Sequence, residues 1–136
     1  MLAKDGKVFA VEKEKERVIH IEKNKNKFKI YNLEIIRKKA PDGLRNLPAP
    51  DAVFIGGGGK DVSKILEVCS KRIKRYGRIV VNAITIETLA AAAHFFEASG
   101  WDMETVSVNI AKTKDVAYSH LFNAHNPVFI IVGEKP

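Results

Sequence analysis

The chain has 136 residues, enough for one domain with a substantial hydrophobic core. Hydrophobic residues make up 46% of it and charged residues 29%, an ordinary globular composition that argues against a disordered protein. No apolar run reaches the roughly 20 residues of a membrane-spanning helix, and residues 1–6 lack the apolar core of a signal peptide. We therefore expect a cytoplasmic protein with no membrane partner.

The formal net charge of +7 is concentrated in the first part of the chain. Residues 1–50 contain 13 Lys and Arg against 7 Asp and Glu, whereas residues 51–136 contain 10 against 9. Such an excess suits a polyanionic partner, either nucleic acid or a small molecule with many carboxylates. A solvated lysine-rich helix explains most of these lysines equally well.

The first half of the chain predicts two short strands around a lysine-rich helix. We expect the strands over residues 7–12 and 33–37 and the helix over residues 13–29. Residues 1–5 are typical of a helix that ends at the following glycine. A connection with a short helix is expected over residues 41–47.

The second half alternates apolar strands with helical segments. The predicted elements are a strand ending at Ile55, a helix over 61–75, a strand over 78–83, a helix over 86–99, and strands over 101–110 and 127–133. This alternation predicts an α/β fold with a largely parallel, helix-covered sheet. The last two strands lack an intervening helix, so we expect an antiparallel pair. With no visible boundary, residues 1–136 are predicted to form a single domain.

Four glycines, Gly56 to Gly59, follow the apolar strand and precede a helical pattern. Glycine lets a backbone approach a ligand closely, because it has no Cβ and tolerates positive φ. The run therefore predicts either a ligand-binding loop at the edge of a sheet or a flexible turn that binds nothing.

Polar residues at other strand ends are further candidates for a site. Glu12 ends the first strand, where a carboxylate accepts hydrogen bonds from a ribose diol; a surface acid is the alternative. Asn82 and Thr85 follow a later strand and are expected near the glycine run. Thr85 is equally suited to cap the next helix.

The histidines and the cysteine do not suggest a metal site. His120 and His125 are five residues apart in a loop-like segment, which is not a recognised ligand spacing. His120, beside Tyr118, either helps to bind a substrate or is an ordinary loop histidine. Cys69 is predicted to be a small buried residue.

The chain resembles the decarboxylating precorrin methyltransferases of the CbiT type almost from end to end. The resemblance rests on four segments: GKVFAVEKEKE, PAPDAVFIGGGGKDVSKIL, GRIVVNAITIETL and NPVFIIVGEKP. It implies a class I S-adenosylmethionine-dependent methyltransferase fold, which is Rossmann-like. The implied reaction is methyl transfer to a carbon of a precorrin macrocycle with loss of carbon dioxide. It also implies a homo-oligomer, a tetramer assembled through the later strands.

The resemblance also implies roles for individual residues. Those expected to bind S-adenosylmethionine are Glu12 at the ribose, Ala40 at the adenine edge, and Gly56 and Gly57 beside the methionine end. Those expected on the precorrin side are Asn82, Thr85 and His120.

Two departures from the family pattern shape our expectations. The family's first strand and glycine-rich loop do not precede Met1, so we expect an N-terminally incomplete sheet with a gap beside the first strand and impaired cofactor binding. Lys38 and Lys39 stand where the family has Gly-Asp before the proline, which weakens adenine recognition. A nucleic-acid methyltransferase or RNA-binding module, and a non-catalytic fragment, are the alternative hypotheses; nucleic acid is the less favoured partner because no aromatic-interleaved basic strand is present.

Overall fold

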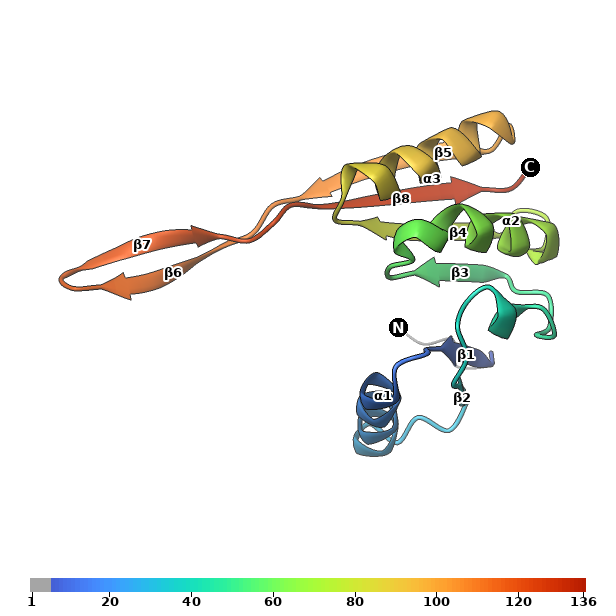
Figure 1. The fold of residues 1–136 in the computed structure, drawn as a ribbon, viewed down its shortest axis with the longest axis horizontal. Helices are drawn as coiled ribbons and strands as arrows, with labels where there is room; N and C mark the ends of the chain where they lie inside the picture. Colours follow the sequence, from blue (N-terminus) through green and yellow to red (C-terminus); the bar gives the residue numbers. More distant parts are fainter. Residues whose placement is uncertain (1–5) are drawn as a thin grey trace. The chain divides into compact units, whose positions relative to one another are not determined.

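The computed structural model describes residues 6–136, so the predicted helical tail over residues 1–5 lies outside the described residues. Contacts between Cα atoms divide the chain into two compact units, residues 1–48 and 49–136, and each is described by itself. Figure 1 labels the elements of both units. The single domain expected over residues 1–136 stays a prediction.

The first unit is a two-stranded parallel sheet with one helix. Strand β1 (Val8–Val11) pairs in register with β2 (Leu33–Ile36), and helix α1 (Lys15–Lys27) connects them. A short 3-10 helix, η1 (Asp42–Leu44), follows. These bounds confirm the two strands, the helix and the short helical connection predicted from the sequence.

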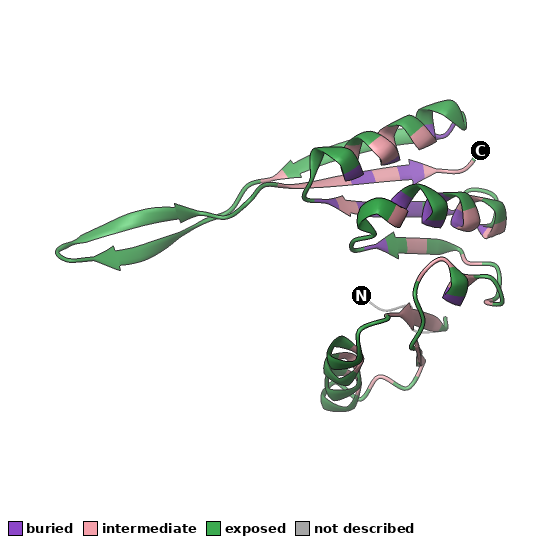
Figure 2. Ribbon diagram, in the orientation of Figure 1, coloured by how far each residue is buried: buried purple, intermediate pink, exposed green. Residues whose placement is uncertain are grey.

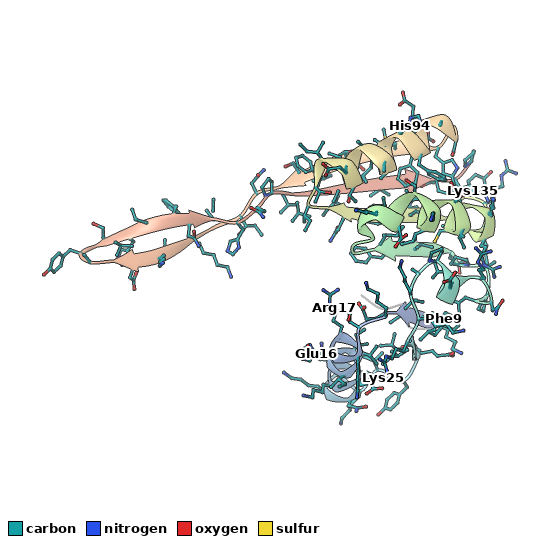
Figure 3. The ribbon with its side chains drawn as sticks, viewed as in Figure 1. Phe9, Glu16, Arg17, Lys25, His94 and Lys135 are labelled. Carbon is teal, nitrogen blue, oxygen red and sulfur yellow. The ribbon has the colours of Figure 1, made fainter. Side chains whose placement is uncertain are left out.

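Helix α1 is a solvated helix. None of its 13 residues is buried, and only Val18, Ile21 and Lys25 are half-buried, at the three- and four-residue spacing of one helical face. Charged side chains such as Arg17 project from the helix (Figure 3). Most lysines on this helix are therefore exposed to solvent, which is compatible both with a solvated helix and with a polyanionic partner.

The second unit contains the remaining elements. In chain order they are β3 (Ala52–Ile55), η2 (Gly59–Asp61), α2 (Val62–Arg72), β4 (Arg78–Ala83), α3 (Ile86–Ala98), β5 (Asp102–Val108), β6 (Ala111–Val116), β7 (Ser119–Ala124) and β8 (Val128–Glu134). Four of these strands form a sheet in the order β3-β4-β8-β5.

The four-stranded sheet is mixed, so the prediction of a largely parallel sheet is wrong. Strands β3 and β4 are parallel, but β8 is antiparallel to both β4 and β5. The reason lies in the connections: a helix joins β3 to β4, whereas β5 reaches β8 through two further strands that reverse the chain. The predicted antiparallel pairing of the last two sheet strands is confirmed.

The core lies between this sheet and the two helices α2 and α3, which cover the same face (Figure 1). Alternate β4 residues, Ile79, Val81 and Ala83, are 0% exposed because the pleat points them toward the helices. Phe96 of α3 is also 0% exposed and packs against Gly133, where an added Cβ would approach its ring to 2.4 Å. Figure 2 shows the buried residues gathered in this layer.

The end of the chain is tied to helix α2 by Lys135. Its Nζ donates hydrogen bonds to the carbonyl oxygens of Ser70 and Ile73, at 2.9 and 3.1 Å. These carbonyls belong to the last turn of the helix, where backbone acceptors lack intrahelical partners and a cation is favoured. Figure 3 labels Lys135 at this end of the sheet.

Strands β6 and β7 form a hairpin that projects from the sheet (Figure 1). The interpretation of the segment around His120 and His125 as loop-like is wrong, because β7 occupies Ser119–Ala124. All 12 strand residues are exposed, so no face is buried and the apolar alternation that marks a half-buried strand is absent. The two-residue turn is Ala117-Tyr118, with Ala117 at φ 49°, rather than the Asn-Gly pair that signals a hairpin.

The last strand of the sheet is well covered within the chain. Residues 128–132 are each buried or half-buried in the sheet. In the Ala90 to Ala93 run, Ala92 is fully buried. Large exposed apolar side chains lie on the hairpin, where they are Val116, Tyr118, Leu121 and Phe122. Others lie elsewhere in this unit: Phe54, Tyr76, Ile84, Ile86, Met103, Val106 and Ile110.

Candidate functional site

A cavity of about 260 Å³ opens at one edge of the four-stranded sheet. Strands β3 and β4 are parallel and both end at this edge, and antiparallel β8 begins there. The cavity therefore collects residues from three separate segments of the second unit. They are Gly56, Gly57, Gly59, Asn82, Ile84, Thr85, Thr88 and Val128.

The glycines of the loop after β3 occur at their positions for different structural reasons. A Cβ on Gly56 would lie 3.1 Å from the Phe54 ring, so this glycine makes room for a neighbouring side chain. A Cβ on Gly57 or Gly59 would meet no atom within 4 Å. Their backbones thus face open space, which is the arrangement that a closely approaching ligand requires.

Two of the glycines are also required by their backbone conformation. Gly58 has φ 149° and Gly59 has φ 47°, a region that residues with a Cβ rarely adopt. The chain turns here from the buried end of β3 into η2 and α2. These φ values explain why glycine occurs at both positions, and the choice between a ligand-binding loop and a flexible turn stays a prediction.

Thr85 caps helix α3. Its Oγ1 accepts a hydrogen bond from the backbone N–H of Thr88 at 3.2 Å, and the two threonine hydroxyls are 3.0 Å apart. The capping role predicted as one alternative is confirmed. Thr85 also lines the cavity, so the cap and the candidate site share one side chain.

Asn82 supplies a further polar group to the cavity. It lies on β4 one residue from the strand's end, and its side-chain amide makes no hydrogen bond to any of the residues described. Both its donor and its acceptor atoms are therefore available to a ligand. Among the described residues, the side chains that line this cavity carry no formal charge.

Glu12 lies in the first unit and already has partners there. One carboxylate oxygen accepts a hydrogen bond from the N–H of Glu14 at 2.9 Å, and the other lies 3.7 Å from Nη1 of Arg17. These contacts place a negative charge at the start of α1, where it is stabilising. In the structure Glu12 therefore interacts with neighbouring residues at the start of α1, and its contact with a ribose stays a prediction.

The remaining predicted residues do not line the cavity. Ala40 is half-buried in the connection after β2 of the first unit. His120 lies on β7, where its Nδ1 is 2.7 Å from the Asp115 carboxylate on the paired strand, and both side chains are exposed. The structure therefore brings together Gly56, Gly57, Asn82 and Thr85.

Sequence reasoning missed three side chains in the cavity: Ile84, Thr88 and Val128. Thr88 is a polar side chain that is only 7% exposed, and its burial is visible only in the structure. Val128 could have been found from its position, because the start of an antiparallel strand lies at the same edge as the ends of its neighbours.

Cys69 is a buried, free cysteine, as predicted, and is 4% exposed. Burial raises the pKa of its thiol from 9.0 to about 11, against a smaller opposing effect of Arg72. Such a thiol is protonated at neutral pH and is a poor nucleophile.

Within residues 6–136 no three His, Cys, Asp or Glu side chains are grouped so as to hold a metal ion. No described helix is long and apolar enough to cross a membrane.

Comparison with known proteins gives one consistent result. The family model described as "Precorrin methyltransferase domain" matches residues 1–135. A curated relative from Sulfurisphaera tokodaii, "Probable cobalt-precorrin-6B C(15)-methyltransferase (decarboxylating)", is 37% identical over 137 residues, which is 100% of this chain and 71% of that protein.

Solved structures agree with this match. A precorrin-6y C5,15-methyltransferase from Geobacter metallireducens has a TM-score of 0.88 and 40% identity, covering 98% of this chain and 71% of its own. A precorrin 8W decarboxylase from Methanobacterium thermoautotrophicum has a TM-score of 0.85 and 27% identity, covering 93% and 69%. The predicted α/β, class I methyltransferase-like fold is confirmed. The chain belongs to the precorrin methyltransferase domain family.

Proposed function

We propose that this chain transfers a methyl group from S-adenosylmethionine to a carbon of a precorrin macrocycle, with loss of carbon dioxide from the same substrate. The observation that supports it most is the cavity at the ends of β3 and β4, where Gly57 and Gly59 leave backbone facing open space. Relatives that the chain matches along its whole length carry this activity in their names.

The chemistry of the cavity suits this reaction. S-adenosylmethionine, when bound, supplies an activated methyl on its sulfonium. An in-line displacement depends chiefly on holding the acceptor carbon, the methyl carbon and the sulfonium sulfur in one line. This requirement favours a shaped, neutral pocket over an acid–base pair. Gly57 would lie against the cofactor, while Asn82 and Thr85 would orient the acceptor from the neighbouring segment.

Transfer of label from methyl-labelled S-adenosylmethionine to a precorrin, followed by mass spectrometry, tests the proposal. Gly57→Val should reduce transfer by at least tenfold, because its side chain would occupy space that is open in the structure. Ala49→Val, in an exposed connection, is the matched control and should be unaffected. A Gly57→Val variant that folds and retains full transfer would contradict the placement of the site.

Cofactor binding is measured independently by calorimetric titration with S-adenosylhomocysteine. Saturable binding would support S-adenosylmethionine as the methyl donor, and the absence of binding to the folded protein would contradict it. Glu12→Ala should weaken binding more than Glu16→Ala, because a buried pair of ribose hydroxyls would lose a charged acceptor. Equal, small effects of both substitutions would leave Glu12 with its local role at the start of α1.

We also propose that the chain assembles into a homo-oligomer through the β6–β7 hairpin. An isolated two-stranded hairpin is marginally stable in water, and this one exposes apolar side chains on both faces. Val116 and Leu121 lie on one face and Phe122 on the other, by the cross-strand register. A second copy would cover these side chains, and the resemblance implies a tetramer.

Light scattering at micromolar concentration tests the assembly. Tyr118 is fully exposed at the hairpin turn and Tyr76 is 65% exposed elsewhere, so they form a matched pair. Combining Phe122→Ser with Tyr118→Ser should shift the mass toward the 15.1 kDa monomer, whereas Tyr76→Ser should not. A monomeric wild-type protein would exclude this role of the hairpin.

A further inference from the structure

We infer that Thr88 is a substrate-binding residue, and that the Thr85–Thr88 hydroxyl pair presents one hydrogen-bond donor to an oxygen atom of the acceptor. The inference rests on the proposed function, because it identifies how the same cavity holds its substrate. Its basis is the geometry of two hydroxyls 3.0 Å apart that both line the cavity.

The two hydroxyls together have two protons. One proton is used in the hydrogen bond between them, in which the Thr85 hydroxyl donates to Thr88 Oγ1, so the proton of the buried Thr88 hydroxyl is the one left over. One lone pair of Thr85 Oγ1 is also engaged, since this atom accepts from the Thr88 backbone N–H. One hydroxyl proton therefore remains without an acceptor inside the pair.

The described residues offer that second proton no acceptor. A helical threonine commonly donates to the carbonyl four residues earlier, but neither hydroxyl makes such a bond here. Thr88 is 7% exposed, so bulk water has little access to its side chain. The open direction for the remaining proton is the cavity that both residues line.

The ligand group that fits this donor is an oxygen with free lone pairs, and a carboxylate is the strongest such acceptor. The Asn82 amide lies in the same cavity and offers a second donor. The precorrin macrocycle of the proposed function carries several carboxylates. A pair of neutral donors would fix the position of one carboxylate but would bind it less tightly than an Arg or Lys side chain.

Two substitutions separate this role from the structural one. Thr88→Val removes the hydroxyl but keeps the backbone N–H that Thr85 caps, so the helix start is retained. Thr88→Ser keeps the hydroxyl and serves as the conservative rescue. The probe is uroporphyrin, a tetrapyrrole octacarboxylate whose fluorescence reports binding, and thermal unfolding is followed in parallel.

We expect Thr88→Val to weaken uroporphyrin binding and raise the KM for the precorrin by about tenfold, the effect of one lost hydrogen bond to a charged group, with kcat changed less. Thr88→Ser should restore both, and affinity for S-adenosylhomocysteine should be unchanged in either variant. Wild-type binding with an equal affinity of Thr88→Val would overturn the inference alone. A wild-type protein that binds no tetrapyrrole would overturn the proposed function, and the inference with it.

Discussion

The second unit contains two regions of opposite character that are continuous in the chain. In the layered region, α2 and α3 cover one face of the sheet and bury side chains such as Phe96 and Ile131 completely. In the hairpin, every strand residue is exposed (Figure 2). Strand pairing alone therefore creates no core, because one face of the strands must also be covered by other elements.

The same contrast separates the two roles proposed for this unit. The cavity lies at the edge of the layered region, where Asn82 and Thr88 are held by a packed strand and a capped helix. A site on such elements keeps its geometry. The hairpin offers no comparable rigid frame but does offer exposed apolar side chains, which suit contact with another copy.

The largest expected difference comes from one substitution made in both regions. Phe96→Ala should lower the free energy of unfolding by about 3–5 kcal/mol, because it leaves a cavity under α3. Phe122→Ala, at a side chain that is 81% exposed, should change it by less than about 0.5 kcal/mol in the monomer. Urea unfolding below the association range measures both, and equal losses would show that the hairpin packs onto the core.

A second pair of substitutions compares a packed glycine with an open one. Gly133→Ala should destabilise the fold by about 1–3 kcal/mol, since the added Cβ would lie 2.4 Å from the Phe96 ring. Gly57→Ala adds a methyl group that meets no atom within 4 Å, so stability should be nearly unchanged. Thermal unfolding distinguishes them, and a tolerated Gly133→Ala would contradict the close packing of α3 on β8.

Loss of the helix cap should have a smaller effect. Thr85→Ala removes the acceptor of the Thr88 N–H and should cost about 1 kcal/mol. Thr85→Ser keeps an acceptor and should cost less. The difference in urea midpoint between these two variants measures the cap directly, and identical midpoints would assign Thr85 to the cavity alone.

A pH dependence from Cys69 has no effect at neutral pH and is expected only in alkaline solution. Its pKa is about 11 in the folded protein against an ordinary value of 9.0, so the folded state holds the thiol proton more tightly than the unfolded state. The stability from this residue is complete below pH 9 and is lost as pH rises toward 11. The wild-type protein should therefore lose stability in this window faster than Cys69→Ala, and parallel profiles would contradict the buried thiol.

The sequence predicted best those elements that bury one face. The strand of β4 and the helix α3 were placed within one residue because their apolar spacing reflects the core they build. The hairpin was missed because its strands are polar and exposed on both faces, and its Ala-Tyr turn lacks the usual glycine or asparagine. The direction of β8 was predicted relative to β5, but its pairing with β4 depends on tertiary packing.

The candidate site was predictable in part for a related reason. Gly57, Asn82 and Thr85 each follow or end one of two parallel strands, so topology alone brings them to one edge. The orientation of Thr88 and the partners of Glu12 depend on side-chain packing that spacing does not encode. His120 was placed with the site by resemblance, and the structure puts it on the hairpin instead of the cavity wall.

The most direct test of the central claim is the stoichiometry of the proposed reaction. Purified protein is incubated with S-adenosylmethionine and cobalt-precorrin-6B, and methyl incorporation and released carbon dioxide are quantified in the same sample. The account predicts one carbon dioxide for each methyl transferred, with both falling together in Gly57→Val. Carbon dioxide release without methyl transfer, or neither product from a folded protein that binds both substrates, would contradict it.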